Sequence, residues 1–326
     1  MRIAYLAPMK VVNPKEVPGF TGGTSLILVE FPGSSIRMNP SLTEVIPRNF
    51  TQNFIGEANL PMLIISARRN FSHSDHFANR AYSIGDVDLQ SDTVIEQDIP
   101  IDQFIERVRN KRILLLVHGY NTEQDDVYDA YAVIERKCQK HLRNTYDLVL
   151  GFSWPGGDQP WEWKQAKSRA NGAGRRLRFL LESMPCQAID VMSHSLGGRV
   201  VLKALKYSGR NHLVRNYFCT AAAVDDECLE PGEEFARSVR SWQRMFVFHS
   251  KYDTVLSTAY IMAEFDSALG LRGPEDKDYI QTKTDSVFVV NCKHHIRSHG
   301  GYKNSSKIYQ FMDRYVTDCP PKLLTL

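Results

Sequence analysis

One stretch decides the fold of this chain: Ala188-Ile189-Asp190-Val191-Met192-Ser193-His194-Ser195-Leu196-Gly197-Gly198-Arg199-Val200-Val201-Leu202. Its first five residues are apolar except for Asp190, which is typical of a buried strand, and apolar residues return after the glycines at helical spacing. The string Ser-His-Ser-Leu-Gly between them predicts a sharp turn. Such a turn strains the backbone of its central residue and tolerates only small residues two positions to either side. Ser193 and Gly197 meet that requirement around Ser195.

This strand–turn–helix context is typical of the G-x-S-x-G nucleophile elbow, here with a serine in place of the first glycine. The turn is expected to aim the Ser195 hydroxyl off the carboxyl end of the sheet, which makes Ser195 the candidate nucleophile. Ser193 lies two residues too early relative to Gly197 and is expected to be structural. Because a small-x-Ser-x-Gly string also arises by chance, the interpretation depends on the rest of the chain.

Composition narrows the class of protein. The chain has 326 residues, of which 43% are hydrophobic and 24% charged, as in a globular protein with a substantial core. The formal net charge is +3 and no block of Lys and Arg occurs, so neither nucleic acid nor an anionic membrane is implied as a partner. We expect no signal peptide and no membrane span. Six scattered cysteines without a C-x-x-C pair suggest reduced thiols, and we expect a cytoplasmic protein.

From about residue 105 onward, apolar runs alternate with amphipathic segments. The expected strands lie at 112–117, 147–152, 188–192, 217–224, 245–249 and 286–290. Helices are expected at 122–138, opening on a Thr122-x-x-Asp125 capping box, and at 166–184. Strands separated by helices predict an α/β fold, with a mostly parallel sheet of about eight strands flanked by helices.

The first hundred residues have a different pattern. Segments 2–6, 25–31 and 62–65 are strand-like and are separated by connections rich in Pro and Gly. We interpret residues 1–104 as antiparallel strands that extend one edge of the sheet, and 105–326 as the core of a single domain covering 1–326. Residues 254–285 are either a cap over the site or a plain insertion, and the tail after Cys319 is expected to leave the fold.

Two further residues complete a Ser–Asp–His order along the chain. Asp253 follows the strand expected at 245–249, and His299 lies in the loop after the strand expected at 286–290. A serine nucleophile needs a base to take its proton and an acid to orient that base, and this chain order is one in which such triads occur. The alternatives to Asp253 as the acid are Asp225 and Asp226.

Backbone donors for an oxyanion are expected from two turns. The Leu196 N–H follows the nucleophile, and the Tyr120 N–H lies in the His-Gly turn after the first buried strand. His118 is expected to hold that turn by hydrogen bonds, and His194 to serve in packing. With Trp154, these two histidines are the candidates for the substrate pocket.

The remaining aromatic and histidine residues allow two interpretations each. Trp154, Trp161 and Trp163 either line an acyl pocket or pack beneath a long loop. His295 and His299 have the i, i+4 spacing of a helical metal pair, but the glycines after His299 make a helix there unfavourable. No carboxylate or cysteine accompanies them at ligand spacing, so we expect no metal and no cofactor.

Five motifs occur in order between about residues 60 and 315. They are His118-Gly119-Tyr120-Asn121, Phe152-Ser153-Trp154-Pro155-Gly156-Gly157, His194-Ser195-Leu196-Gly197, Ala222-Ala223-Val224-Asp225 and Tyr252-Asp253-x-x-Leu256. Together they resemble a bacterial branch of α/β hydrolases of unknown function within the esterase/lipase superfamily. Two positions depart from that pattern: Ser193 stands two before the nucleophile, and Leu196 stands where Met is usual. Both changes are sterically mild.

The resemblance implies an α/β-hydrolase fold and a serine hydrolase of the carboxylesterase or lipase-like kind. The expected reaction cleaves a small-molecule carboxylic ester through an acyl-enzyme on Ser195. Thioester or amide hydrolysis uses the same machinery and stays open. An alternative from a different class is a catalytically silent α/β-hydrolase scaffold used for binding. No oligomeric state follows from the sequence.

Overall fold

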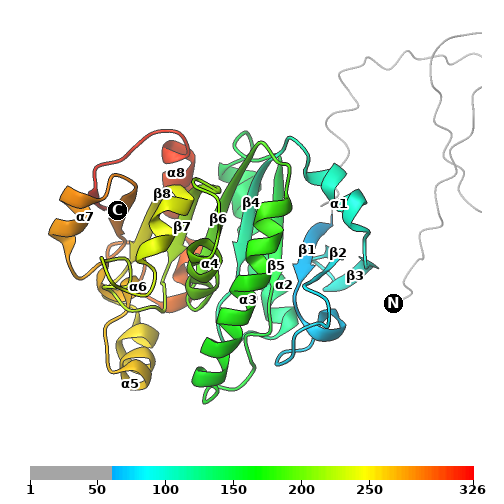
Figure 1. Ribbon diagram of the computed structural model, residues 1–326, viewed down its shortest axis with the longest axis horizontal. Coiled ribbons are helices and arrows are strands. Elements are labelled where there is room, and N and C mark those ends of the chain that lie inside the picture. Colours follow the sequence, from blue (N-terminus) through cyan, green and yellow to red (C-terminus); the bar gives the residue numbers. More distant parts are fainter. Residues whose placement is uncertain (1–60) are drawn as a thin grey trace, which may run out of the picture. The chain divides into compact units, whose positions relative to one another are not determined.

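A computed structural model describes residues 61–326, and the strands expected at 2–6 and 25–31 lie outside that range. The described strands form one sheet in the order β10-β9-β8-β7-β6-β4-β5-β1-β2-β3 (Figure 1). The strands are β1 (Met62–Ser66), β2 (Ser83–Asp88), β3 (Thr93–Gln97), β4 (Arg112–Val117), β5 (Leu148–Ser153), β6 (Ala188–His194), β7 (Val214–Thr220), β8 (Trp242–His249), β9 (Val287–Asn291) and β10 (Leu323–Thr325). All pairs from β10 across to β1 are parallel, which confirms the predicted α/β architecture.

The predicted antiparallel extension is present at one edge of this sheet. β2 pairs antiparallel with β1, and β3 pairs antiparallel with β2. β1 itself joins the parallel part, because it pairs parallel with β5 on its other side. Residues 62–65, expected among the antiparallel strands, therefore form the junction between the two kinds of pairing.

Helices cover both faces of the sheet. α3 (Trp163–Ser183) and α4 (Gly197–Lys206) pack together on one face, and α2 (Gln124–His141) and α8 (Ser306–Tyr315) pack together on the other (Figure 1). α1 (Ile101–Val108) leads into β4. In α3 the buried stripe follows the expected period, with Ala166, Ala170, Ala173 and Leu177 fully buried.

Two boundaries differ from the sequence expectation for physical reasons. The strand expected at 217–224 ends at Thr220, and Ala221 takes a left-handed φ of 49°. Residues 221–224 are apolar because they form a buried turn and not because they continue the strand. At α2 the expected capping box is absent: the Thr122 hydroxyl donates to the Tyr120 carbonyl oxygen instead.

The chain end also departs from the expectation. Instead of leaving the fold after Cys319, the chain returns and adds β10 to the sheet edge beside β9. The Lys322 carbonyl oxygen accepts a hydrogen bond from the Val289 N–H, and Leu326 N–H donates to the Asn291 carbonyl oxygen. The two proline residues at 320 and 321 lie in the connection, where a missing N–H has no consequence for the ladder.

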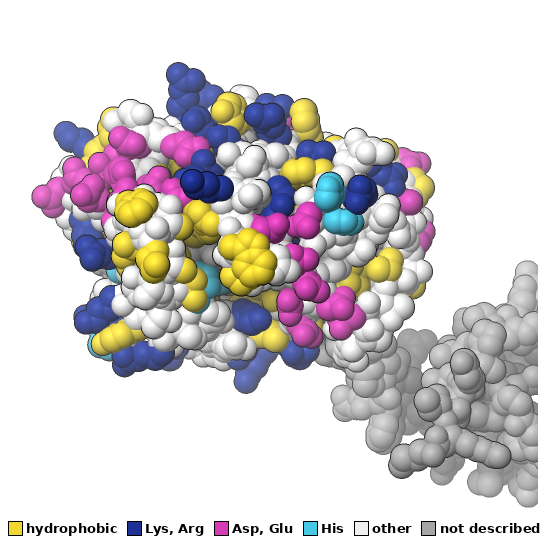
Figure 2. Space-filling model, turned by 90° about the horizontal axis from the view of Figure 1, so that it is seen from below, with side chains coloured by type: hydrophobic (Ala, Val, Ile, Leu, Met, Phe, Trp, Pro, Cys, Tyr) yellow, Lys and Arg dark blue, Asp and Glu magenta, His cyan; other side chains and the backbone are white. Residues whose placement is uncertain are grey.

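Residues 254–285 fold as short helical pieces beyond the ends of the parallel strands. They are the π-helical turn η4 (Leu256–Tyr260), α5 (Ile261–Glu264), α6 (Leu269–Arg272) and α7 (Lys277–Lys283). α5 projects below the ends of the strands (Figure 1), and Figure 2 looks onto this end of the molecule, where hydrophobic side chains lie between groups of acidic ones. Within residues 61–326, no helix has both the length and the hydropathy needed to cross a lipid bilayer.

Candidate active site

The turn after β6 has the geometry of a nucleophile elbow. Ser195 takes a left-handed φ of 54°, a conformation that few non-glycine residues adopt. Its N–H donates to the Thr220 carbonyl oxygen at 3.0 Å, and its carbonyl oxygen accepts from the Gly198 N–H at 2.9 Å. A Cβ built on Gly197 would lie 2.4 Å from the His118 carbonyl oxygen. The small residue expected from the sequence at 197 is therefore required by the close approach of the neighbouring loop.

The structure brings Asp253 and His299 together. Asp253 follows β8 and is fully buried, and its Oδ2 lies 2.8 Å from His299 Nδ1. Its other oxygen, Oδ1, accepts a hydrogen bond from the Leu256 N–H at 3.0 Å. His299 opens the 3₁₀-helical turn η5 (His299–Asn304) after β9. Because the carboxylate engages Nδ1, Nε2 is the ring nitrogen of His299 left for other chemistry.

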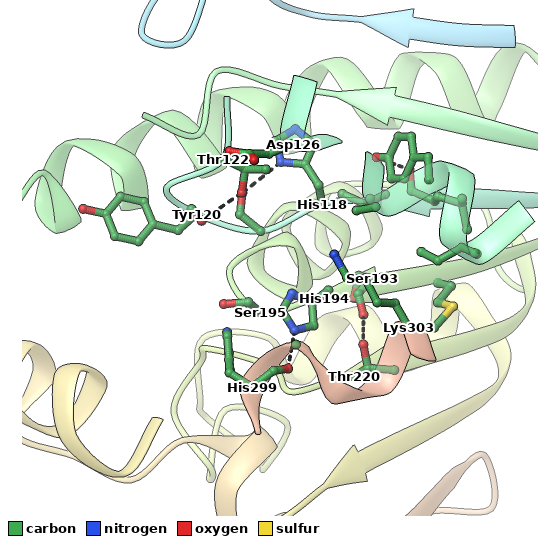
Figure 3. Close-up of a pocket in the computed structure, with 18 of the residues that line it drawn as sticks. His118, Tyr120, Thr122, Asp126, Ser193, His194, Ser195, Thr220, His299 and Lys303 are labelled. Atoms are coloured by element: carbon green, nitrogen blue, oxygen red, sulfur yellow. Dashed lines mark hydrogen bonds between the residues drawn. The ribbon is translucent and has the colours of Figure 1, made fainter. Parts of the chain in front are cut away.

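Ser195 and His299 line the same pocket, a cavity of about 300 Å³ at the carboxyl ends of β4 and β6 (Figure 3). Within residues 61–326, no hydrogen bond joins the Ser195 hydroxyl to the His299 ring. Contacts between a nucleophile and its base are often long before substrate binds and shorten afterwards.

The alternative residues for the nucleophile and the acid have other partners. The Ser193 hydroxyl lies 2.9 Å from the Tyr217 hydroxyl inside the core. Asp225 accepts a hydrogen bond from the Tyr260 hydroxyl at 2.5 Å. Asp226 is buried, and burial, followed by its neighbour Glu227, raises its pKa to about 6. In the described part of the chain, neither aspartate contacts His299.

The two backbone N–H groups that the sequence suggests as oxyanion donors lie in turns that approach each other. The Leu196 N–H follows the nucleophile at the start of α4, and the Tyr120 N–H lies in the turn after β4. No hydrogen bond among residues 61–326 uses either N–H group. A Cβ on Gly119 would lie 3.0 Å from Ser195 Cβ, so the missing side chain permits the two turns to approach. The Tyr120 ring points away from the pocket, and its hydroxyl donates to the Gln159 carbonyl oxygen (Figure 3).

His118 holds its turn by hydrogen bonds, as expected. Its Nε2 accepts from the Trp154 N–H at 3.0 Å, and its Nδ1 therefore carries the proton and donates to the Gly119 carbonyl oxygen at 3.0 Å. Burial, helped by the charge of Arg68, lowers the pKa of His118 well below its usual value, so the ring stays neutral. His118 also lines the pocket.

Trp154, a candidate for the substrate pocket, is not among the residues that line it, and of the two interpretations given above the structure favours packing. Trp154 is fully buried, stacks on His118 with ring centroids 5.4 Å apart, and donates from its indole nitrogen to the His118 carbonyl oxygen. The other two tryptophans considered for an acyl pocket have separate environments: Trp163 packs edge-on against Tyr120, whereas Trp161 is 77% exposed. Trp154 therefore contacts the pocket residue His118 without lining the pocket itself.

His194 contacts His299 directly. The His194 Nε2–H donates to the His299 carbonyl oxygen at 2.8 Å, and the two ring centroids are 4.6 Å apart. Burial, and then the nearby His299, lower the pKa of His194 to about 3, so the ring is neutral at physiological pH. His194 lines the pocket as expected, and it also fixes the start of η5.

Three charged residues of the pocket were missed by the sequence reasoning. Asp126 and Asp129 come from α2, and Lys303 comes from η5. The sequence held only weak signals that these residues line the pocket. The two aspartates share a face of α2 with Ala130, and Lys303 lies four residues after His299. Charged residues on a helix usually face solvent, and only the approach of η5 to α2 shows that these three share a cavity.

The histidine pair considered for a metal is not assembled into a ligand set. His295 is exposed and lies in the turn before η5. Among residues 61–326, the groups that could hold a metal are Asp75 with Asp158 and Glu162, and Asp226 with Glu227 and Asp266. Neither group includes a histidine.

A mostly parallel sheet with helices on both faces and a strand–serine–helix turn on its central strand defines the α/β-hydrolase fold. Residues 95–310 match the model of a family described as alpha/beta hydrolase of unknown function (DUF900). The chain therefore belongs to this family of α/β hydrolases.

Solved structures with a similar fold share little sequence with the chain. The lin2722 gene product of Listeria innocua is 9% identical, with a TM-score of 0.42, over 67% of this chain and 99% of that chain. The ydeN gene product of B. subtilis is 15% identical, with a TM-score of 0.40, over 64% and 100%. Est1E from Butyrivibrio proteoclasticus is 9% identical, with a TM-score of 0.37, over 72% and 93%. No curated protein matches the chain.

Proposed function

We propose that this α/β hydrolase is a serine hydrolase that cleaves small-molecule carboxylic esters through an acyl-enzyme on Ser195. The observation that supports this most is the 2.8 Å contact between His299 Nδ1 and the buried Asp253, with His299 and Ser195 lining one pocket. Ser195, His299 and Asp253 lie on three separate loops. The stability of the fold alone does not require a strained serine, a histidine and an orienting carboxylate to be brought together there. Acyl transfer uses all three.

In the acylation step, Ser195 Oγ attacks the ester carbonyl carbon and His299 Nε2 takes the hydroxyl proton. Asp253 accepts the Nδ1–H, which holds the ring in the tautomer that leaves Nε2 basic and stabilises the imidazolium that forms. The carbonyl oxygen gains negative charge and accepts hydrogen bonds from the Tyr120 and Leu196 N–H groups. One such donor typically contributes roughly 10²- to 10³-fold to the rate.

The tetrahedral intermediate collapses when the bond to the alcohol oxygen breaks. His299 delivers its proton to that oxygen, and the alcohol leaves. Water then takes the alcohol's place, gives a proton to His299 Nε2 and attacks the acyl carbon. Release of the acid returns the proton to Ser195, so no cofactor enters the cycle.

Intact mass measurement after treatment with a fluorophosphonate, followed by peptide mapping, tests the proposal. We expect one stoichiometric adduct on Ser195 and none in Ser195→Ala. A panel of short and long p-nitrophenyl esters then measures turnover, which Ser195→Ala should reduce by roughly four to six orders of magnitude. Equal hydrolysis by the wild type and Ser195→Ala would refute the assignment. Folded protein that neither reacts nor turns over would favour the silent binding scaffold.

A further inference from the structure

The pocket beside Ser195 combines an apolar wall with one ammonium group. Leu116 and Met192 from the sheet and Tyr131 and Ile134 from α2 line it and are buried. Lys303 is the lining residue that bears an ammonium group, and the other basic side chains of the lining are the imidazoles of His118, His194 and His299. Ligand pockets are mostly apolar and carry a few polar or charged groups that orient the ligand, and the ammonium of Lys303 is such a group here.

Lys303 is oriented into this space. Figure 3 shows its side chain running from η5 into the pocket, on the same side of the cavity as His194. Its positive charge is among the influences that lower the pKa of His194, which places the ammonium near the elbow. Lys303 is only half-exposed, and within residues 61–326 no hydrogen bond or ion pair involves its Nζ atom.

An aliphatic acyl chain in the pocket would cover this ammonium group without giving it a partner. Removing a charge from water without a hydrogen bond is unfavourable. A carboxylate on the chain would instead form a charge-assisted hydrogen bond with the ammonium, and such bonds are about twice as strong as neutral ones. The apolar wall would at the same time contact the methylene groups.

We propose that Lys303 selects esters whose acyl part carries a carboxylate, such as half-esters of short dicarboxylic acids. The inference rests on the acyl-enzyme proposed above. The acyl part is the one that stays attached to Ser195 while the alcohol leaves and water enters, so the pocket is occupied by it during both steps. Asp126 and Asp129 line the same pocket from α2 and are exposed. Their charges oppose an anion, and so they limit the preference that Lys303 creates.

Two esters with the same leaving group and the same number of acyl carbons test this preference. They are mono-p-nitrophenyl glutarate and p-nitrophenyl valerate, and the measured quantity is the ratio of their kcat/KM values. We expect the wild type to favour the glutarate. Lys303→Met should lower the ratio by roughly 10- to 100-fold, the usual effect of a hydrogen bond to a charged group, and Asp129→Asn should raise it.

Lys307→Met is the matched control, because it removes the same charge from an exposed position in α8 that does not line the pocket. Its ratio should equal that of the wild type. Lys303→Arg keeps a cation and should retain part of the preference, which tests the inference even if Lys303→Met folds poorly. Hydrolysis of both esters with a ratio unaffected by Lys303→Met would overturn the role of Lys303 alone. Absence of hydrolysis and of fluorophosphonate labelling in the wild type would overturn the acyl-enzyme proposal with it.

Discussion

His299 Nδ1 lies 2.8 Å from Asp253 Oδ2, although 46 residues separate them in the chain. The two residues follow β8 and β9, which are parallel neighbours in the sheet. Because parallel neighbours end at the same edge, the loops that leave them meet there. The contact is thus a direct product of sheet order. Asp225 has a different partner, because it accepts a hydrogen bond from the Tyr260 hydroxyl.

Replacing Asp253 with asparagine should abolish most of the hydrolytic activity and leave the fold largely unchanged. An amide at this position can donate to Nδ1, which favours the tautomer with its proton on Nε2 and deprives Ser195 of its base. We expect kcat to fall by about 10⁴-fold. Asp225→Asn is the control and should retain hydrolysis of p-nitrophenyl esters. The reverse order of activities would identify Asp225 as the acid.

The strain at Ser195 predicts a gain in stability when it is replaced by glycine. A left-handed conformation costs a non-glycine residue about 1–2 kcal/mol, and glycine has no such cost. Ser195→Gly should therefore unfold at a higher urea concentration than Ser195→Ala, while both are inactive. Equal midpoints for the two variants would show that the φ of 54° carries little strain.

Gly197→Ala should damage both stability and activity. Its Cβ would meet the carbonyl oxygens of His118 at 2.4 Å and Val117 at 2.7 Å, and backbone cannot move aside as a flexible side chain can. Overpacking of this kind typically costs about 1–3 kcal/mol. Gly209→Ala introduces the same methyl group where no atom lies within 4 Å and should be close to neutral. Urea unfolding of the two variants provides the comparison.

His194→Phe should lower kcat more than it changes KM. The substitution removes the donor to the His299 carbonyl oxygen, so the turn that carries the base loses an anchor. A displaced catalytic group can reduce turnover by about 10²-fold. His194→Gln retains an N–H donor and should recover part of the loss. A lower melting temperature with unchanged kcat would restrict His194 to a structural role.

Stability should fall as the pH decreases from 7 to 5. Burial lowers the pKa of His194 to about 3 and that of His249 to about 4, from a usual value of 6.5, and it lowers that of His118 as well. As the pH falls, these histidines therefore take up protons at a higher pH in the unfolded chain than in the folded protein. The contribution of each histidine is complete above pH 6.5 and decreases below it, by about 1.4 kcal/mol per pH unit.

Protonation of Asp226 has the opposite effect on the free energy of unfolding over part of this pH range. Its pKa is raised to about 6 from 3.8, so the folded state takes up a proton first as the pH falls. One carboxyl group does not offset three histidines, and urea unfolding at pH 7 and pH 5 should show a net loss. His249→Gln should reduce that loss. A free energy of unfolding that is the same at both pH values would contradict the neutral burial of these rings.

Much of the fold follows from local patterns. The continuous apolar run of β4 and the alternation of strands with amphipathic helices predict a parallel sheet, because strands buried on both faces typically have that composition. The end of β7 at Thr220 was not predictable, since the apolar residues after it belong to a buried turn. The return of the chain as β10 was also missed, because a three-residue edge strand has too little pattern to detect.

By itself, the sequence determined the elbow. Ser193, Ser195 and Gly197 are fixed by a steric requirement that acts within five residues, so spacing alone identifies them. Only the tertiary structure decided which carboxylate contacts His299, that Trp154 packs against His118, and that the Lys303 side chain extends into the pocket. These relationships depend on which strands are neighbours and on how closely η5 approaches α2. Those distances arise from the packing of the whole sheet and its helices, which no local pattern encodes.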